Sequence, residues 1–313
     1  MKVAQINNYG HSGVIEITDV GKPKIEKGKV LVKVYASSIN PFDTVMREGY
    51  VKTMMSNIPF PIILGGDIAG VAAEIGEGVE NFSVGNKVYG QALVLAGGSG
   101  AFAEFALVLP EHISLAPKNL DFNQSAAIVL TGVSAVQGII EHINLKTNQK
   151  ILIHGGAGGI GTIAIQIAKS IGALVVTTAT GQGIEYVKKL GADQVIDYKN
   201  SSFDEIVSDC DAVFDTVGAD VYSKSFKVLK RGGIIVSMIA PKDEKLAEQF
   251  GVLAITQSTK VTAKNLEILT DFIENKNIKV HIDKVYLLDR IREAFDEKEK
   301  GDVLGKIVLE IQS

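Results

Sequence analysis

The segment that most constrains the fold is an apolar run that turns through closely spaced glycines into an amphipathic stretch. The apolar run is KILIH (Lys150–His154), the glycines lie in HGGAGGIG (His154–Gly161), and the amphipathic stretch is IGTIAIQIAKSIG (Ile160–Gly172). This order is typical of a strand that passes directly into a helix, the first half of a parallel strand–helix–strand unit. The chain is therefore expected to fold around a parallel sheet that helices cover.

Apolar strands continue to alternate with helices after this segment. The predicted strands are Lys150–His154, Leu174–Thr178, Gln194–Asp197, Asp211–Asp215, Ile234–Ile239 and Val252–Thr256. Amphipathic segments such as GIEYVKKLG (Gly183–Gly191) lie between most of them. Six strands are the size of a complete dinucleotide-binding domain. The sequence thus predicts an α/β fold with a doubly wound parallel sheet of six strands.

Residues 1–121 have a different, β-rich character. Short β-branched or alternating runs such as Lys29–Ile39 and Asp67–Ile75 are separated by glycine-rich turns, and six of the seven prolines lie here. The tail mixes helix and strand and is expected to pack against this first part. The prediction is one domain made of residues 1–121 and 262–313, into which an α/β domain of residues 122–261 is inserted.

The composition argues against several classes of partner and site. The formal net charge is −4 and no block of basic residues occurs, so neither nucleic acid nor an anionic membrane is expected as a partner. We find no secretory apolar region and no run of about eighteen apolar residues, which predicts a cytoplasmic protein. Cys210 is the only cysteine, which excludes an internal disulfide and a cysteine-rich zinc site.

Gly156, Gly158 and Gly161 fit the pattern G-x-G-x-x-G between a strand and a helix. In that context the first glycine permits the tight turn, the second lets a pyrophosphate approach the backbone, and the third allows close helix–strand packing. The free N–H groups and partial positive charge of the helix N-terminus favour phosphates. The sequence predicts a dinucleotide site here, with a purely structural turn as the alternative.

The end of the next strand indicates which dinucleotide binds. It reads TTATGQG (Thr177–Gly183), and no acidic residue lies between Gly161 and Glu185. An Asp or Glu in this region usually holds a free ribose 2′-hydroxyl. Its absence removes repulsion toward a 2′-phosphate, to which Thr178 and Thr180 could donate hydrogen bonds. This favours NADP(H) over NAD(H), although neither arginine nor lysine lies at the strand end.

Beyond these patterns, the chain resembles the medium-chain dehydrogenase/reductase superfamily, and in particular its zinc-independent quinone oxidoreductase and enone reductase branch. The resemblance covers essentially the whole length. It rests on SSINPFDTVMREG (Ser37–Gly49), ILGGDIAGVAAEIGEGVENFSVGNKVYG (Ile63–Gly90), GGSGAFAEF (Gly97–Phe105), LTGVSAVQGI (Leu130–Ile139), HGGAGGIG, LGADQVIDY (Leu190–Tyr198), FDTVG (Phe214–Gly218) and GKIVLEI (Gly305–Ile311). The resemblance implies a GroES-like catalytic domain formed by both chain ends, a Rossmann domain, and an active site in the cleft between them.

The sequence departs from the zinc alcohol dehydrogenases of that superfamily at their metal ligands. Those enzymes have a cysteine in the segment where this chain has Asn40 and Pro41, and a histidine where it has Gly66; their four-cysteine structural zinc loop is also missing. Zinc needs ligands that converge on one point, and five scattered histidines with one cysteine supply no such set. No metal is predicted. His11, His112, His142 and His281 are interpreted as solvated or capping residues, and His154 as a residue that packs the glycine loop.

Without a metal, the resemblance implies hydride transfer from a reduced nicotinamide to an acceptor that is already activated, a quinone or an α,β-unsaturated carbonyl. Asn40 matches the family asparagine that lies at the nicotinamide and the substrate. Tyr50 could donate its hydroxyl to the carbonyl oxygen or relay a proton. An ordinary Asn-Pro turn and a merely packed tyrosine are the alternatives. Asp43 is interpreted as structural, and Asp67 as either a support for the cleft or a satisfied buried acid.

The resemblance also implies where the cofactor is held. The predicted cofactor residues are Asn40 and Thr131 at the nicotinamide, Gly156, Gly158, Gly159, Ile160 and Gly161 at the pyrophosphate, Thr178, Thr180 and Tyr198 around the adenosine phosphate, and Val217 and Gly218 at a strand end that faces the cofactor. Gln182 stands where many relatives have a lysine, a departure from the NADPH pattern.

Two further expectations concern partners. The rival to an enzyme is a non-catalytic protein that binds NADPH as a sensed or stabilising ligand, since a fold does not fix a function. Relatives commonly pair as homodimers through the edges of their Rossmann sheets, and the apolar segments 232–240 and 251–258 could serve there or could simply be core.

Overall fold

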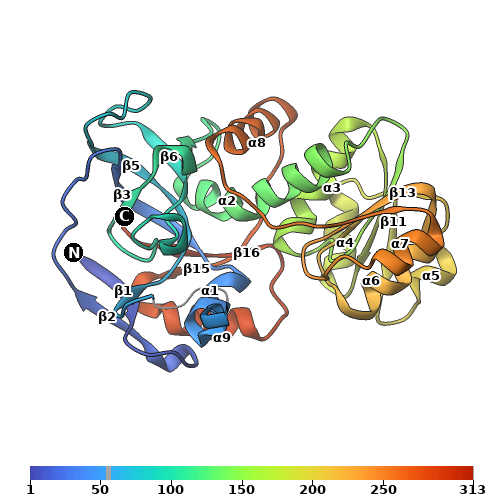
Figure 1. Cartoon of the computed structure of the whole chain (residues 1–313), viewed down its shortest axis with the longest axis horizontal. Coiled ribbons are helices and arrows are strands. Elements are labelled where there is room, and N and C mark those ends of the chain that lie inside the picture. Colours follow the sequence, from blue (N-terminus) through green and yellow to red (C-terminus); the bar gives the residue numbers. More distant parts are fainter. Residues whose placement is uncertain (54–57, 313) are drawn as a thin grey trace. The chain divides into compact units, whose positions relative to one another are not determined.

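The computed structural model describes residues 1–53 and 58–312, which form two compact units. The first unit consists of Met1–Leu130, Val261–Glu274 and Val280–Ser313, and the second of Thr131–Lys260 and Asn275–Lys279. Figure 1 shows both, coloured along the chain. The predicted fold class, α/β with a β-rich domain and a six-stranded parallel sheet, is confirmed.

The second unit is built on six parallel strands in the order β11-β10-β9-β12-β13-β14. The strands are β9 (Lys150–Ile153), β10 (Leu174–Ala179), β11 (Gln194–Asp197), β12 (Cys210–Asp215), β13 (Leu229–Ser237) and β14 (Leu253–Thr256). The chain enters at β9 in the middle of the sheet and the strand order reverses between β9 and β12. Sheets of this kind bind ligands at that reversal point, so the loop after β9 is placed where a ligand is expected.

Helices connect these strands. They are α3 (Gly159–Ile171), α4 (Gln182–Lys189), α5 (Phe203–Ile206), α6 (Ala219–Ser225), which continues into η6 (Phe226–Val228), and α7 (Glu244–Phe250). Glycines mark both ends of α3: Gly158 is its N-cap, and Gly172 ends it in the left-handed conformation with φ of 88°. The side chains of Ile151, Leu152 and Ile153 in β9 are fully buried, as a strand covered by helices on both faces requires.

The sequence suggested two apolar segments, 232–240 and 251–258, as a dimer contact at the edge of this sheet, and only one of them lies at an edge. The segment 232–240 largely forms β13, which is paired with β12 on one side and with β14 on the other. It therefore has no free edge within the chain. Of the two segments, only 251–258 reaches an edge of the sheet, as β14, and Leu253 is exposed there. The homodimer itself stays a prediction.

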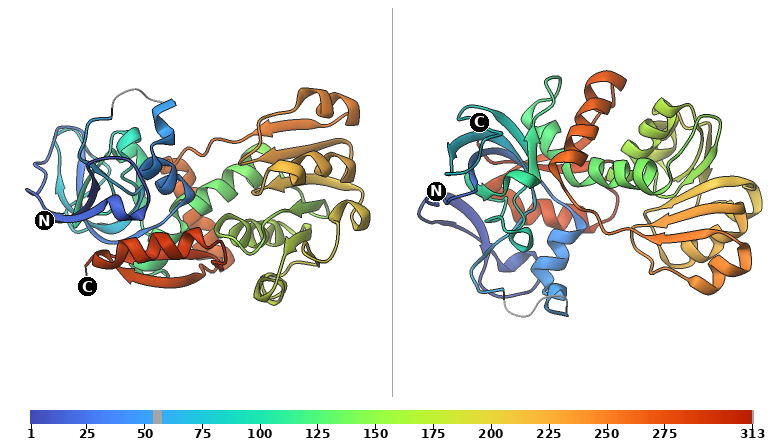
Figure 2. Two further views of the ribbon diagram at one scale, coloured as in Figure 1. Left: turned by 90° about the horizontal axis from the view of Figure 1, so that it is seen from below. Right: turned by 45° about the horizontal axis from the view of Figure 1, so that its top comes forward.

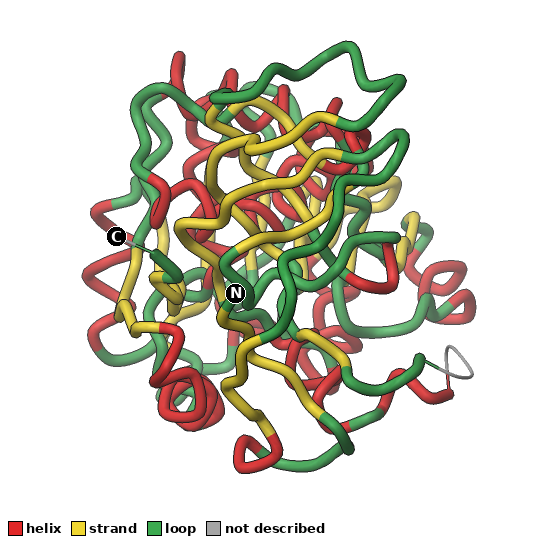
Figure 3. Tube along the Cα trace, turned by 90° about the vertical axis from the view of Figure 1, so that its left-hand side faces the viewer, coloured by secondary structure: helices red, strands yellow, loops and turns green. Residues whose placement is uncertain are grey.

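The first unit contains a sheet of seven strands and a smaller sheet of three (Figure 3). The larger sheet has the order β15-β16-β3-β5-β6-β8, with β7 also paired to β3, and the smaller has the order β2-β1-β4. The strands are β1 (Lys2–Ile6), β2 (Ile15–Asp19), β3 (Val30–Ser38), β4 (Ile62–Ile63), β5 (Asp67–Ile75), β6 (Lys87–Gln91), β7 (Phe105–Val108), β8 (Ile113–Leu115), β15 (Ile282–Leu287) and β16 (Lys306–Glu310).

The C-terminal tail is part of the first unit. Strand β16 pairs antiparallel with β3, and Figure 2 shows the red C-terminal segment beside the blue N-terminal part of this unit. Helix α9 (Ile291–Glu299) buries Ile291, Ala294 and Phe295 in the core of the unit. The remaining helical elements are η1 (Ser12–Val14), α1 (Pro41–Glu48), η2 (Tyr50–Thr53), η3 (Val94–Ala96), η4 (Pro110–His112), α8 (Ala263–Lys276) and η7 (Leu288–Arg290). The sheet therefore joins residues from both ends of the sequence.

Helix α2 (Phe122–Val136) crosses from one unit to the other, and the π-helical segment η5 (Gln137–His142) continues it. The division between the units falls at Leu130, inside this helix, and not at the expected boundary before residue 122. The stretch Phe122–His142 is long and apolar enough to cross a membrane by length and composition alone, but 78% of its apolar 18-residue window is buried inside the protein. Such burial is that of a core helix, so this stretch gives no reason to expect a membrane partner.

Candidate active site

The three glycines of the loop after β9 differ in the space that surrounds them. A Cβ on Gly156 would lie 2.0 Å from Oγ1 of Thr177, and one on Gly161 would lie 2.3 Å from the carbonyl oxygen of Gly155, so the fold itself requires glycine at both positions. A Cβ on Gly158 would meet only that same carbonyl oxygen, at 3.4 Å, which is an ordinary contact. Among the described residues, then, no neighbour forbids a side chain at Gly158. An open backbone at this position is what a closely approaching pyrophosphate needs.

His154 ties the glycine loop to the neighbouring elements. Its ring is buried, and its Nε2 lies 3.0 Å from Oγ of Ser225, whose own hydrogen is donated to the Val221 carbonyl at 2.6 Å. Nε2 must therefore carry the proton and donate it. Its Nδ1 is left to accept from the Thr178 hydroxyl at 3.3 Å, and Thr178 Oγ1 in turn accepts from the Gly155 N–H at 3.1 Å. The histidine thus packs the loop, as interpreted from the sequence.

Burial lowers the pKa of His154 to about 4, although Asp215 raises it in part. An unfolded chain takes up a proton on this ring below pH 6.5, whereas the folded chain does not until pH is near 4. The stability from the neutral ring is therefore complete above pH 6.5 and decreases as pH falls toward 4, by up to about 1.4 kcal/mol per pH unit. We expect His154→Asn to reduce the shift in the urea midpoint between pH 7 and pH 5, while the exposed control His11→Asn keeps it. Equal shifts in wild type and His154→Asn would contradict this.

The predicted adenosine-phosphate residues differ in what they can still bind. Thr178 is buried and its hydroxyl is committed to His154 and Gly155, so the structure gives it a role in holding the loop. Thr180 donates a hydrogen bond to Asp197, a contact that lowers the pKa of that carboxyl. Tyr198 follows Asp197, and its ring is exposed. The hydroxyl hydrogen of Thr180 is thus already donated, and Thr180 can bind a phosphate only in place of Asp197, whereas Tyr198 lies exposed.

Asp197 is a residue that sequence reasoning missed. It ends β11, which pairs with β10 so that Ala179 lies opposite Asp197. The search for an acid considered only the end of β10, but the adjacent parallel strand brings a carboxylate to the same edge. The signal was the acidic end of the predicted strand Gln194–Asp197. This carboxylate lies beside Thr180 and opposes a 2′-phosphate there.

Val217 and Gly218 form a fixed turn beside the glycine loop. The Asp215 carboxylate accepts from the N–H groups of both residues at 2.9 Å, and Ser237 donates to its other oxygen at 2.7 Å. The hydroxyl of Thr216 donates to the His154 carbonyl at 2.8 Å, which joins the turn to the loop. The turn leaves the Val217 side chain half exposed next to the loop.

The other predicted cofactor residues of the second unit lie on helices. Ile160 is in the first turn of α3, directly after Gly159, and both are partly exposed. Thr131 lies in α2 and is buried. Ile160 and Gly159 thus belong to the same loop–helix junction as Gly158. The contacts of these residues with a cofactor stay predictions.

In the first unit, Asn40 lies in a buried group of polar side chains, which we call the Asn40 cluster: Ser38, Asn40, Asp43, Asp67 and Lys306. The Asn40 backbone N–H donates to Asp43 Oδ2 at 2.7 Å, and its side-chain Nδ2 donates to Asp67 Oδ2 at 2.7 Å. Lys306 Nζ donates to Asn40 Oδ1 at 2.6 Å. Both ends of the carboxamide are therefore held.

Three adjacent strands assemble the Asn40 cluster. Asn40 follows the end of β3 and caps α1, whose first residue is Pro41, a residue suited to that position. Asp67 begins β5, where it pairs with Ser38 of β3, and Ser38 Oγ donates to Asp67 Oδ2 at 2.8 Å. Lys306 begins β16, on the other side of β3. Sheet pairing thus brings together residues that are hundreds of positions apart in the sequence.

The Asn40 cluster places one ammonium against two carboxyl groups away from water. Burial raises the pKa of Asp43 to about 7 and also raises the pKa of Asp67, and the Lys306 charge lowers both in part. Burial lowers the pKa of Lys306 to about 8, against the attraction of Asp67 and Asp43. The charged forms of these three groups therefore depend on one another.

The residues around Asn40 do not suit a zinc ion. Within residues 1–53 and 58–312, no group of three or more His, Cys, Asp or Glu side chains could hold a metal. At Asn40 itself an ammonium already hydrogen-bonds the carboxamide oxygen and the Ile39 carbonyl, the latter at 2.8 Å. A positive charge in that place repels a second cation. The absence of a bound metal in the protein stays a prediction.

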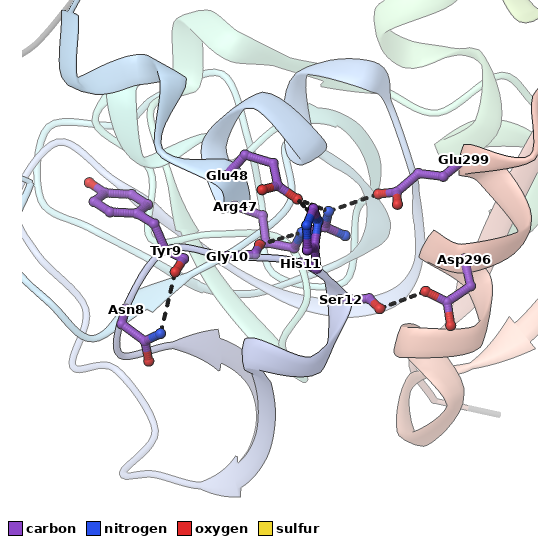
Figure 4. Close-up of polar contacts among 9 residues, drawn as sticks. All are labelled: Asn8, Tyr9, Gly10, His11, Ser12, Arg47, Glu48, Asp296 and Glu299. Atoms are coloured by element: carbon purple, nitrogen blue, oxygen red, sulfur yellow. Dashed lines mark hydrogen bonds and ion pairs between the residues drawn. The ribbon is translucent and has the colours of Figure 1, made fainter.

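The far end of α1 is anchored by Arg47 (Figure 4). This guanidinium is fully buried, donates to the Gly10 carbonyl at 3.0 Å, and pairs with Glu48 and, at 2.8 Å, with Glu299 of α9. Tyr50 begins η2 just beyond this anchor, and its side chain is 67% exposed. The structure thus places Tyr50 at the surface and Asn40 in the interior, at opposite ends of the same helix.

Comparison with known proteins identifies the class. Residues 26–118 match the alcohol dehydrogenase GroES-like domain, and residues 190–309 match the family described as zinc-binding dehydrogenase. The chain is 33% identical to a 2-methylene-furan-3-one reductase of Solanum lycopersicum, over 99% of this chain and 79% of that protein. It is 31% identical to a chloroplastic NADPH-dependent alkenal/one oxidoreductase of Arabidopsis thaliana, with the same shares covered.

Comparison with a solved structure supports the same class of protein. The quinone oxidoreductase of Coxiella burnetii superposes with a TM-score of 0.90 at 31% identity, covering 100% of this chain and 99% of that one. The chain belongs to the medium-chain dehydrogenase/reductase superfamily, among its quinone oxidoreductases and enone reductases, and is an oxidoreductase. The resemblance stated from the sequence is confirmed. One relative is chloroplastic, and the cytoplasmic location of this chain stays a prediction.

Proposed function

We propose that this protein is an NADPH-dependent, metal-independent reductase of quinones or of α,β-unsaturated carbonyls. The observation that carries the proposal is the Asn40 cluster, where a carboxamide fixed between an ammonium and a carboxyl group stands in the segment that carries a metal ligand in zinc enzymes. Relatives named as NADPH-dependent alkenal/one oxidoreductase and as quinone oxidoreductase support the acceptor class.

The second unit offers residues that fit a dinucleotide. Gly158 leaves the backbone open at the start of α3, where N–H groups without helical partners favour a pyrophosphate. Tyr198 would hold the adenosine phosphate together with Thr180, which would exchange its contact with Asp197 for the phosphate, and Val217 and Gly218 would border the cofactor beside the loop. When bound, NADPH supplies the hydride.

In the first unit, Asn40 would stabilise charge on the acceptor. A conjugated carbonyl that takes a hydride at its β-carbon develops negative charge on its oxygen. The Asn40 amide has two N–H bonds and gives one to Asp67; among the described residues, none is recorded as accepting the other. That N–H would donate to the developing oxyanion, and Tyr50, an exposed residue beyond the other end of α1, would supply or relay through solvent the proton that completes the reduction.

The products formed from a 2-alkenal test the metal-free reduction of conjugated bonds. We expect proton NMR of the product to show the saturated aldehyde, with the vinyl signals lost and the aldehyde signal kept, from an enzyme that contains no zinc by elemental analysis and is unaffected by a chelator. An allylic alcohol as the product, or activity that a chelator abolishes, would contradict the proposal.

The adenosine end gives a separate prediction on cofactor preference. Replacing Thr180 by Val and Tyr198 by Phe together removes two hydroxyl groups suited to a 2′-phosphate. We expect the Michaelis constant for NADPH to rise about tenfold and that for NADH to change little, since one lost hydrogen bond to a charged group costs about 1.5 kcal/mol or more and the Thr180 hydrogen is already donated to Asp197. The control variant is Thr178→Val, which removes a hydrogen bond that holds the glycine loop and should raise the Michaelis constants for both NADPH and NADH. Equal increases for both cofactors in the double variant would exclude this role.

A further inference from the structure

Lys306 is an unusual residue for its position. Strand β16 reads KIVLE, and the four residues from Lys306 to Leu309 are all buried. A lysine is rarely buried so fully unless its charge is paired or its donors are used. No role was predicted for Lys306 from the sequence. Its segment GKIVLEI served only as one of the motifs of the family resemblance.

The hydrogen bonds of Lys306 give it a specific task. Its ammonium donates to the Ile39 carbonyl at 2.8 Å and to Asn40 Oδ1 at 2.6 Å, two oxygens that can only accept. At the other end of the carboxamide, Asp67 Oδ2 lies 2.7 Å from Asn40 Nδ2. A carboxamide turned by 180° about its last torsion would direct its N–H bonds at the ammonium and its oxygen at the carboxylate. Both contacts would become repulsive, so only one orientation satisfies the cluster.

We propose that Lys306 is a positioning residue, which holds the Asn40 carboxamide so that its second N–H is presented to the acceptor. This inference rests on the proposed function, because it assigns Lys306 a part only if Asn40 acts in the reduction. Lys306 touches neither substrate nor cofactor in this role and acts through Asn40 alone.

Removing the ammonium is expected to free the carboxamide. In Lys306→Met the side-chain oxygen of Asn40 loses its hydrogen-bond donor. The buried carboxyl groups of Asp43 and Asp67 also lose the positive charge of Lys306, which lowers the pKa of both. A buried carboxyl without a cation takes up a proton. A protonated Asp67 can donate to Asn40, so it no longer requires the carboxamide to present an N–H. Both orientations are then allowed.

A double-mutant cycle tests this through catalysis. We expect Lys306→Met to lower kcat about 10- to 100-fold with an unchanged dissociation constant for NADPH, since small misplacements of a reacting group are costly. Lys306→Arg should recover part of the loss. On an Asn40→Ala background, Lys306→Met should lower kcat no further. The matched control is Lys29→Met, a partly buried lysine of the same unit that pairs with Glu26, which should leave kcat unchanged. If the methionine variant does not fold, Lys306→Gln is used in its place, because a glutamine amide can donate or accept and so allows both orientations of the Asn40 carboxamide.

A second readout needs neither cofactor nor activity. With asparagine labelled by nitrogen-15, the Asn40 side-chain signals are assigned by their loss in Asn40→Ala, and we expect Lys306→Met, but not Lys29→Met, to shift or average them. A normal kcat and unmoved signals in Lys306→Met would overturn the inference and leave the proposed function standing. A further loss of kcat on the Asn40→Ala background would overturn it as well, because Lys306 would then act by another route. An Asn40→Ala variant with full turnover would instead overturn the proposed role of Asn40, and the catalytic part of this inference with it.

Discussion

Gly158→Ala is expected to weaken NADPH binding on the order of a hundredfold while the protein stays folded. In the structure a methyl group at this position meets only the Gly155 carbonyl oxygen, at an ordinary 3.4 Å, and the backbone φ of −80° suits alanine. The stability cost is that of a poorer N-cap, about 1 kcal/mol or less. A pyrophosphate that approaches the backbone here would instead be pushed away from its N–H donors. Each charge-assisted hydrogen bond lost costs about 1.5–3 kcal/mol.

Two measurements separate binding from folding in this variant. NADPH affinity is followed by fluorescence titration, and stability by the melting temperature. The contrast is Gly161→Ala, whose methyl group would lie 2.3 Å from the Gly155 carbonyl oxygen, so that stability and affinity should fall together. If Gly158→Ala bound NADPH as tightly as wild type, the glycine loop would not be the pyrophosphate site.

Asn40→Ala is expected to lower kcat about 100- to 1000-fold and to leave the NADPH dissociation constant nearly unchanged. A decrease in kcat of this size is typical when an enzyme loses one preorganised hydrogen-bond donor to a developing oxyanion. The substitution also leaves Lys306 and Asp67 without the group that lies between them, so a loss of about 1–3 kcal/mol in stability is expected as well.

The kinetic loss must therefore be separated from the loss in stability. Asn119→Ala provides the control, since its side chain also donates a partly buried hydrogen bond in the first unit, to the Ile273 carbonyl at 3.1 Å. It should cost stability without lowering kcat. Unchanged turnover in Asn40→Ala, measured well below its melting temperature, would remove Asn40 from the mechanism.

The sequence was most informative where one local pattern decides one structural element. All six predicted strands of the parallel sheet are present, because apolar runs of strand length between helices have no other way to bury both faces. The glycine loop was also predicted, and the structure leaves no room for a Cβ at Gly156 and Gly161 while Gly158 stays open. Asn40 was identified through its Asn-Pro segment and the family resemblance.

What the sequence could not show depends on which strands are neighbours. Lys306 reaches Asn40 only because β16 pairs with β3, and Asp197 lies beside Thr180 only because β11 pairs with β10. No local pattern shows which strands pair, and the acidic end of the predicted strand Gln194–Asp197 becomes informative only once its neighbour is known. Thr178 illustrates the same limit, since its hydroxyl was interpreted as a phosphate donor but is used by His154 and Gly155. The domain boundary inside α2 was missed because a continuous helix has no break in its pattern.

The central claim is that this chain transfers hydride from NADPH to an activated acceptor. The most direct test is the absorbance of NADPH and of NADH, each followed with the purified protein and an ortho-quinone, and then with a 2-alkenal. We predict oxidation that depends on the acceptor and is faster with NADPH than with NADH. Tight NADPH binding with no oxidation by either acceptor would contradict the claim and would identify the protein as a binder of the cofactor and not an enzyme that uses it.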